Sequence, residues 1–148
     1  MYKSDIDNER TTKMPAPQEW SPAFSVGNPI LDEQHRKLLA ICKGLVLCGE
    51  LRGAERVSRF HELLDEIARF AREHFKTEEN ILANVGYSDL EEQKREHLEF
   101  EERFTEILCD ASTGTIDIPE ISRFVSDWWL NHIQIADMRY KETLSRLP

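Results

Sequence analysis

Histidines and carboxylates at helical intervals are the residues of this chain best suited to bind a metal. Glu78 follows one histidine by four residues, an interval that places an imidazole and a carboxylate on one helix face, about one turn apart. Such a pair can share a metal ion. Four of the five histidines lie beside apolar residues, one in each of four separate segments: His35, His74, His97 and His132.

Two of these histidines have a polar residue nearby in the sequence, at a helical spacing in one case and not in the other. Gln93 precedes His97 by four residues, so an amide would lie on the same helix face as the imidazole. Asp137 follows His132 by five residues, a rotation of about 140° on an ideal helix. Spacing alone therefore does not pair Asp137 with His132.

The set of donors suits two metal ions better than one. Imidazoles mixed with carboxylates suit iron, manganese or zinc, but six such donors exceed the four of a tetrahedral zinc site. Glu78 and Asp137 are the natural bridges between two ions, because a shared oxide and two carboxylates offset most of the cationic charge in a core. The fifth histidine, His61, would lie about 20 Å along a helix from His74. We expect it at the surface.

The ferritin-like di-iron site does not fit this sequence. That site needs Glu-x-x-His on two helices. The residues three positions before the four histidines are Asp32, Ala71, Lys94 and Trp129, of which only the first is acidic.

Four helices would position these side chains. Apolar residues recur at helical spacing, and the patterns end at turn-forming residues, with Ser88 and Glu91 predicting a capping box at the third helix. We therefore predict an all-α, up-down-up-down four-helix bundle. The predicted helices run from Pro29 to before Gly49, from about Ala54 to Ala83, from about Ser88 to 112–114, and from Pro119 to about 144.

Several apolar residues are expected to pack the core of this bundle. The helical stripes include, among their apolar residues, Ile30, Val57, Leu98 and Ile135. Aromatic residues near the histidines are first of all core packing, and they would also wall a dry ligand pocket: Phe75, Phe100, Trp128 and Trp129.

Composition limits the class of protein. With 148 residues and 40% hydrophobic residues the chain fits one domain, which we place at 20–148 after a flexible tail at 1–19 that contains Pro15 and Pro17. The formal charge of −9 argues against a nucleic-acid or anionic-membrane partner. No signal peptide or membrane-spanning run is found, and three cysteines without a CxxC pair predict core thiols in a cytoplasmic protein.

Four stretches of the chain together are specific, although each alone is weak. They are VGNPILDEQHRKLL around His35, HFKTEENIL with His74 and Glu78, HLEF with His97, and WWLNHIQIADMRY with His132 and Asp137. Between Trp20 and about 144 the chain thereby resembles the hemerythrins, in particular bacterial hemerythrin-like domains.

The resemblance implies a bundle around two iron ions bridged by an oxo or hydroxo group, Glu78 and Asp137. It also implies reversible O2 binding at the iron held by His35 and His74, and it supplies the pairing of His132 with Asp137. The partners it implies are O2 and small anions.

One residue departs from the family pattern. That pattern has His-x-x-x-His on the third helix, whereas this chain reads QKREH, with Gln93 in place of the first histidine. Gln93 is then either a weak ligand or a residue that orients bound water. Glu92 and Glu96 are less suited as substitutes, because each points about 100° or more away from Gln93 or His97.

An open second iron favours oxidation of the centre over storage of O2. We therefore predict an O2- or redox-sensing regulatory domain, as family members are often fused to signalling output domains, rather than an enzyme. An O2 carrier or store, a di-iron oxidase or peroxidase, and a metal-free interaction bundle remain the alternatives.

Overall fold

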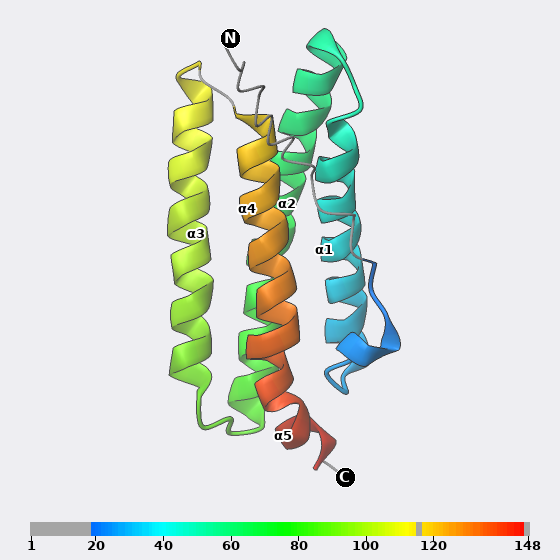
Figure 1. Cartoon of the computed structure of the whole chain (residues 1–148). Helices are drawn as coiled ribbons and strands as arrows, with labels where there is room; N and C mark the ends of the chain where they lie inside the picture. Colours follow the sequence, from blue (N-terminus) through cyan, green and yellow to red (C-terminus); the bar gives the residue numbers. More distant parts are fainter. Residues whose placement is uncertain (1–18, 115–116, 147–148) are drawn as a thin grey trace, which may run out of the picture.

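The computed structural model describes residues 19–114 and 117–146, and the predicted tail lies outside them except for Glu19. Within these ranges the chain contains helices and no strand (Figure 1). A 3-10 turn η1 precedes the long helices, and a π-helical turn η2 and a 3-10 turn η3 follow the fourth. The elements are η1 (Pro22–Phe24), α1 (Pro29–Cys48), α2 (Gly53–Asn84), α3 (Leu90–Ser112), α4 (Ile118–Asn131), η2 (His132–Ala136), η3 (Asp137–Tyr140) and α5 (Lys141–Ser145).

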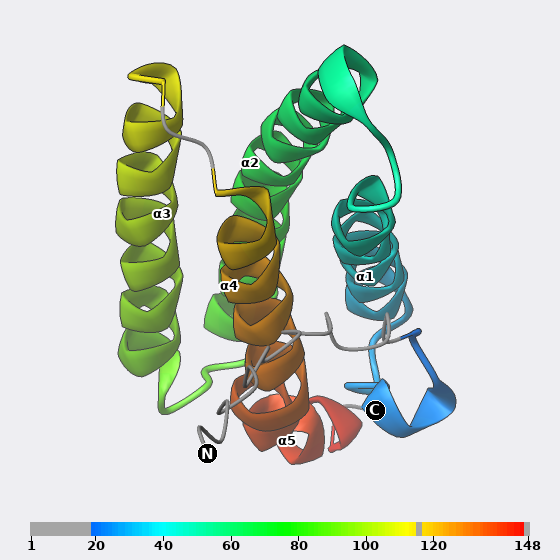
Figure 2. The same cartoon turned by 45° about the horizontal axis from the view of Figure 1, so that its top comes forward.

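The four long helices alternate in direction and lie side by side, which confirms the predicted four-helix bundle. α1 packs against α2 and α4, and α2 packs against α3. Figure 2, turned from the first view, shows the same arrangement, with α1 and α3 on opposite sides of α2 and α4. The short helix α5 lies at the end of the bundle where α1 begins.

Local chemistry explains where the helices start. The Asn28 side chain accepts hydrogen bonds from the backbone of Ile30 and Leu31, and Asp117 accepts one from Glu120, so α1 and α4 each have a side-chain cap. The predicted capping box at Ser88 is wrong.

At the start of α3, the backbone N–H of Leu90 donates to the carbonyl of Tyr87. This turn takes up Ser88 and Asp89, so α3 begins at Leu90 with Asp89 at the cap position and no side-chain cap bond.

The core has two clusters of apolar side chains. The larger cluster fills the bundle from Leu38 on α1 to Ile133 in η2. The smaller one closes the end of the bundle near α5 and consists of Val26, Leu31, Leu82, Tyr87, Tyr140 and Leu144. Along α1, α2 and the segment after α4, a short polar interval separates the residues of one cluster from those of the other.

Some predicted core positions are exposed. Ile30, Val57, Leu98 and Ile135 are each at least 42% exposed, so their assignment to the core was wrong. Three of them are adjacent in sequence to a buried residue. Successive helical residues point about 100° apart, so a residue next to a buried one lies on a more exposed face of the helix. Cys42 and Cys48 are buried as predicted, whereas Cys109 lies exposed near the end of α3. Among the described residues no helix is long and apolar enough to cross a membrane.

Candidate metal centre

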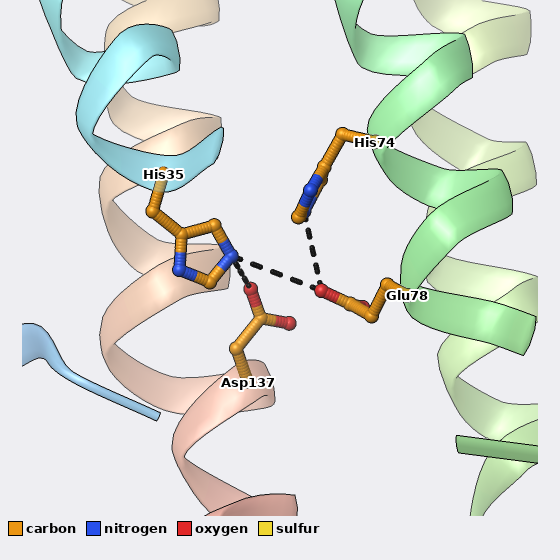
Figure 3. Close-up of side chains that lie close together, drawn as sticks. All are labelled: His35, His74, Glu78 and Asp137. Carbon is orange, nitrogen blue, oxygen red and sulfur yellow. Dashed lines mark ion pairs between the residues drawn. The ribbon is translucent and has the colours of Figure 1, made fainter. Parts of the chain in front are cut away.

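Four predicted ligands meet in the polar interval between the two clusters. His35 comes from α1, His74 and Glu78 from α2, and Asp137 from η3; Figure 3 shows the four side chains directed at one another. His35 Nε2 lies 2.9 Å from Asp137 Oδ2, and His74 Nε2 lies 3.2 Å from Glu78 Oε2. All four side chains are buried, and their donor atoms lie within 4.8 Å of one another. We call this group the His35 site.

A second group lies on the other side of the same carboxylates. His97 on α3 and His132 in η2 approach each other with 3.2 Å between their Nε2 atoms, and His97 Nε2 lies 3.0 Å from Glu78 Oε1. We call Glu78, His97 and His132 the His97 site. The structure thus brings together the six residues expected as ligands.

Each carboxylate directs one oxygen to each site. Glu78 presents Oε2 to His74 and Oε1 to His97, while Asp137 presents Oδ2 to His35 and Oδ1 to His132, the last at 3.0 Å. This is the arrangement expected of carboxylates that bridge two metal ions. The roles of these residues as ligands stay a prediction.

A π-helical turn brings His132 and Asp137 together. The backbone N–H of Asp137 donates to the carbonyl of His132, a bond across five residues instead of the four of an α-helix. The turn widens the helix by one residue, so a five-residue step returns to nearly the same face. The rotation expected for an ideal α-helix does not apply here.

Gln93 lies inside the centre. Its side chain is 3% exposed, and its Nε2 donates to Glu78 Oε1 at 2.7 Å and to Asp137 Oδ1 at 2.6 Å. The same nitrogen lies 3.4 Å from His132 Nε2. Gln93 therefore contacts both predicted bridging carboxylates on the side that faces the His97 site.

Three outer partners that the sequence did not reveal lie beside the outward nitrogens of His74, His97 and His132. Gln34 Oε1 lies 2.7 Å from His74 Nδ1, and Glu79 Oε1 lies 2.8 Å from His97 Nδ1. Glu96 Oε2 lies 3.3 Å from His132 Nδ1. Such partners orient an imidazole and make it a stronger donor to a metal.

The acidic residues of α3 that were weighed as substitute ligands lie elsewhere. Glu96 is on the outer side of His132, and Glu92 pairs with Arg95 at the surface. His61 is exposed on α2, as expected.

Tyr140 is a further residue that sequence reasoning missed. Its hydroxyl donates to Glu78 Oε2 at 3.0 Å, and the side chain is fully buried. Tyr140 lies three residues after Asp137, a spacing that puts both on one helix face, but no spacing rule pairs it with a residue on α2.

Burial and opposite charges shift the pKa values of the centre in opposing directions. Burial alone would lower the pKa of His35 and His132, but the carboxylates beside them raise these values to about 9 and about 10. Burial lowers the pKa of His74. Burial would raise the pKa of Glu78, yet the surrounding imidazoles hold it well below its ordinary value. Burial and the Glu78 charge would likewise raise the pKa of Asp137, but the imidazoles of His132 and His35 lower it, so both carboxylates are ionised.

Aromatic rings wall the centre on the side of the larger cluster. Phe75 stacks on His97 with 3.9 Å between ring centroids, and Trp128 stacks on His132 at 4.5 Å. Phe75, Phe100 and Trp129 are buried, as predicted for core packing, and Trp128 is half-buried. These rings limit the access of water to the two sites.

The donors of the His35 site fit a metal ion. Among the described residues, four buried atoms of its side chains have no hydrogen-bond partner: His35 Nδ1, and three donor atoms that face one another, His35 Nε2, His74 Nε2 and Asp137 Oδ2. Buried polar atoms without a partner are costly, and a cation would satisfy the three donor atoms at once. Two imidazoles and two carboxylates suit iron, as well as manganese or zinc.

Comparisons with known proteins agree with this geometry. Residues 26–144 match the family model described as the hemerythrin HHE cation binding domain. A hemerythrin-like protein of Naegleria gruberi is 35% identical over 90% of this chain and 98% of its own length. A bacteriohemerythrin of Clostridium acetobutylicum is 30% identical over 82% of this chain and 96% of its own length. A crystal structure of a hemerythrin point mutant superposes with a TM-score of 0.76 at 27% identity, covering 88% of this chain and 98% of that one.

Proposed function

This chain belongs to the hemerythrin family of oxygen-binding non-haem iron proteins, and we propose that it is an O2- or redox-sensing di-iron protein whose centre oxidises readily. His35, His74, His97 and His132 would hold two iron ions, with Glu78 and Asp137 bridging them. The irons, when bound, supply reversible binding of O2. A cytoplasmic location and an attached output domain belong to the same proposal.

The surrounding residues have distinct tasks in this function. Glu78 and Asp137 offset the charge of the cations inside the bundle. Tyr140 fixes the orientation of Glu78 through its hydrogen bond. Phe75 and Trp128 hold two imidazole rings in place by stacking.

The presence of Gln93 in the centre, in place of a histidine, favours sensing of O2 over storage of O2. Where relatives of this type would place an imidazole, the chain directs an amide at both bridging carboxylates. An amide is a weaker ligand than imidazole for iron, so the iron at the His97 site would keep a position open to water and small anions. A centre that water and anions reach is poorly suited to store O2.

The connection of the centre to every long helix supports a regulatory role. The candidate ligands come from α1, α2, α3 and the turns that continue α4. A change in ligands at the irons would therefore act on four helices at once, and a sensor needs such a response.

The test is the stability of the oxygenated protein. The iron-loaded, reduced chain is exposed to air, and the visible absorbance is followed with time for the natural chain and for Gln93→His. We expect oxidation at least about 10-fold faster in the natural chain, because only the variant restores a third imidazole. Asn84→His, at an exposed position of α2, is the control for adding a histidine.

Other outcomes point to other functions. Equal, slow oxidation in both proteins would contradict the proposal and favour an O2 carrier. Sustained consumption of peroxide with a reductant would favour a di-iron oxidase or peroxidase. Protein that binds no iron from iron-rich medium would leave a helical interaction bundle.

A further inference from the structure

We propose that the two metal sites fill in order: the His35 site binds the first ion, and the Gln93 amide closes the His97 site until a second ion displaces it. The proposal rests on the di-iron function above and assigns to Gln93 control over metal loading. The chain would therefore have a defined state with one ion, and its second ion would be the exchangeable one.

The position of the Gln93 nitrogen supports closure of the His97 site. An amide nitrogen has two hydrogens, and here both are used, one on Glu78 Oε1 and one on Asp137 Oδ1. These are the carboxylate oxygens that face the His97 site. With His132 Nε2 at 3.4 Å, the nitrogen lies among the atoms that a second metal ion would need.

The Gln93 amide does not reach the His35 site, where the one internal hydrogen-bond donor described above is the Tyr140 hydroxyl on Glu78 Oε2. Three of the site's buried donor atoms lack hydrogen bonds, and His35 Nε2 and Asp137 Oδ2 lie 2.9 Å apart without hydrogen-bond geometry. A cation that enters this site gains ligands and breaks no hydrogen bond of Gln93. A cation that enters the His97 site must first separate Gln93 from two ionised carboxylates, and such charge-assisted bonds are the stronger ones.

A rotation of the amide would complete the second step. A half-turn of the terminal amide exchanges Nε2 with Oε1, which converts a hydrogen-bond donor into an oxygen ligand. Gln93 would then be a blocking group before the second ion arrives and a weak ligand afterwards. A histidine at this position has no oxygen to exchange with a nitrogen, so it could bind the metal only through a ring nitrogen.

Repulsion between the two cations also weakens binding of the second ion, but it does so whatever residue stands at position 93. Comparison with Gln93→His therefore removes this shared repulsion and leaves the combined effect of the blocking amide and the missing imidazole. We expect the second ion to bind about 10- to 100-fold more weakly in the natural chain than in Gln93→His, as for other changes around a metal ligand. The affinity for the first ion should be the same in both.

The experiment is a titration of the metal-free full chain with Zn²⁺, a diamagnetic probe, followed by calorimetry and native mass spectrometry. Zn²⁺ avoids redox chemistry, and anaerobic Fe²⁺ is titrated in parallel. Two resolved steps in the natural chain, with the second strengthened in Gln93→His and unchanged in Asn84→His, support the proposal. Binding of both ions with the same affinities in the natural chain and Gln93→His overturns it while leaving the di-iron function intact.

Nuclear magnetic resonance of the Gln93 side-chain amide reports directly the order in which the two metal sites fill. We expect its two N–H signals to stay protected from solvent exchange through the first equivalent of Zn²⁺ and to shift with the second. Release of the amide at the first equivalent would overturn the proposed order. Failure of the chain to bind either ion would overturn both this proposal and the proposed function, and circular dichroism would show that each variant is folded.

Discussion

Asp137 and His132 are joined twice, through the backbone and through their side chains. The N–H of Asp137 donates to the carbonyl of His132, and the Asp137 carboxylate lies 3.0 Å from the His132 imidazole. The hydrogen bond across five residues is therefore what turns both side chains into the centre. π-Helical turns of this kind are rare and often accompany functional sites.

Changes in the length of this turn should have unequal effects. Deletion of the exposed Gln134 leaves a four-residue step, which an ordinary α-helix also places on one face, so His132 and Asp137 should remain paired. Insertion of one alanine after Gln134 gives a six-residue step of about 240° and should lower bound iron by about half. Iron content per folded chain is the measurement. Equal loss in both variants would contradict this account of the turn.

Removal of the Tyr140 hydroxyl should destabilise the metal-free protein. Burial and the Asp137 and Glu78 carboxylates raise the pKa of Tyr140 well above its ordinary value, so the phenol remains a donor at neutral pH. Tyr140→Phe leaves Glu78 Oε2 without this donor and should lower the free energy of unfolding by about 1.5–3 kcal/mol. Urea denaturation measures it. Tyr87→Phe, in the same cluster, is the control, with an expected change below about 0.5 kcal/mol.

Neutral replacement of the outer carboxylates should weaken the His97 site alone. Glu79→Gln and Glu96→Gln remove the charges beside His97 Nδ1 and His132 Nδ1, which should reduce metal affinity there about 10- to 100-fold. Competition with a chelator of known affinity measures both steps of binding. Glu92→Gln, which removes a carboxylate of α3 that pairs with Arg95, should leave both steps unchanged. An equal loss of affinity at the His35 site would contradict the assignment.

The three thiols should differ in reactivity. Burial raises the pKa of Cys42 to about 12 and also raises that of Cys48, whose Sγ donates to the Arg56 carbonyl. Both thiols therefore stay protonated and covered at pH 8, and thiolate is the reactive form. Cys109 is exposed, so a thiol reagent should modify one cysteine rapidly in the folded chain and all three in urea. Cys109→Ser should abolish the fast phase, and fast modification that persists there would contradict the burial of the other two.

The sequence allowed accurate prediction of the first three helices and of the residues that meet in the centre. The fourth was predicted as one helix to about 144, whereas α4 ends at Asn131 and η2, η3 and α5 follow it. The boundaries of α1 follow from Asn28, Pro29 and Gly49, and helical spacing alone brings His74 and Glu78 together. The pairing of His132 with Asp137 came from family resemblance, because a π-helical turn depends on tertiary packing that no spacing rule describes. Ser88 does not cap α3, because it lies inside the turn closed by the hydrogen bond from Leu90 N–H to the Tyr87 carbonyl.

The outer partners of the histidines and the contacts of Gln93 could not be predicted from the sequence. Glu79 serves a histidine on α3 and Glu96 one in η2, so both contacts depend on the register of neighbouring helices. The sequence identified Gln93 as the departure from the family pattern. Its contact with both carboxylates follows from the approach of three separate segments, which one sequence does not specify.

The polar interval between the two apolar clusters places the candidate metal centre in direct contact with the α5 end of the molecule. Tyr140 belongs to the smaller cluster and also touches Glu78, so the seating of Leu144 and α5 is tied to the state of that carboxylate. A disturbance at Glu78 would act on the C-terminal turns through this hydrogen bond and on the larger cluster through His97 and the Phe75 ring stacked on it. A change in the middle of the bundle would therefore also move its α5 end.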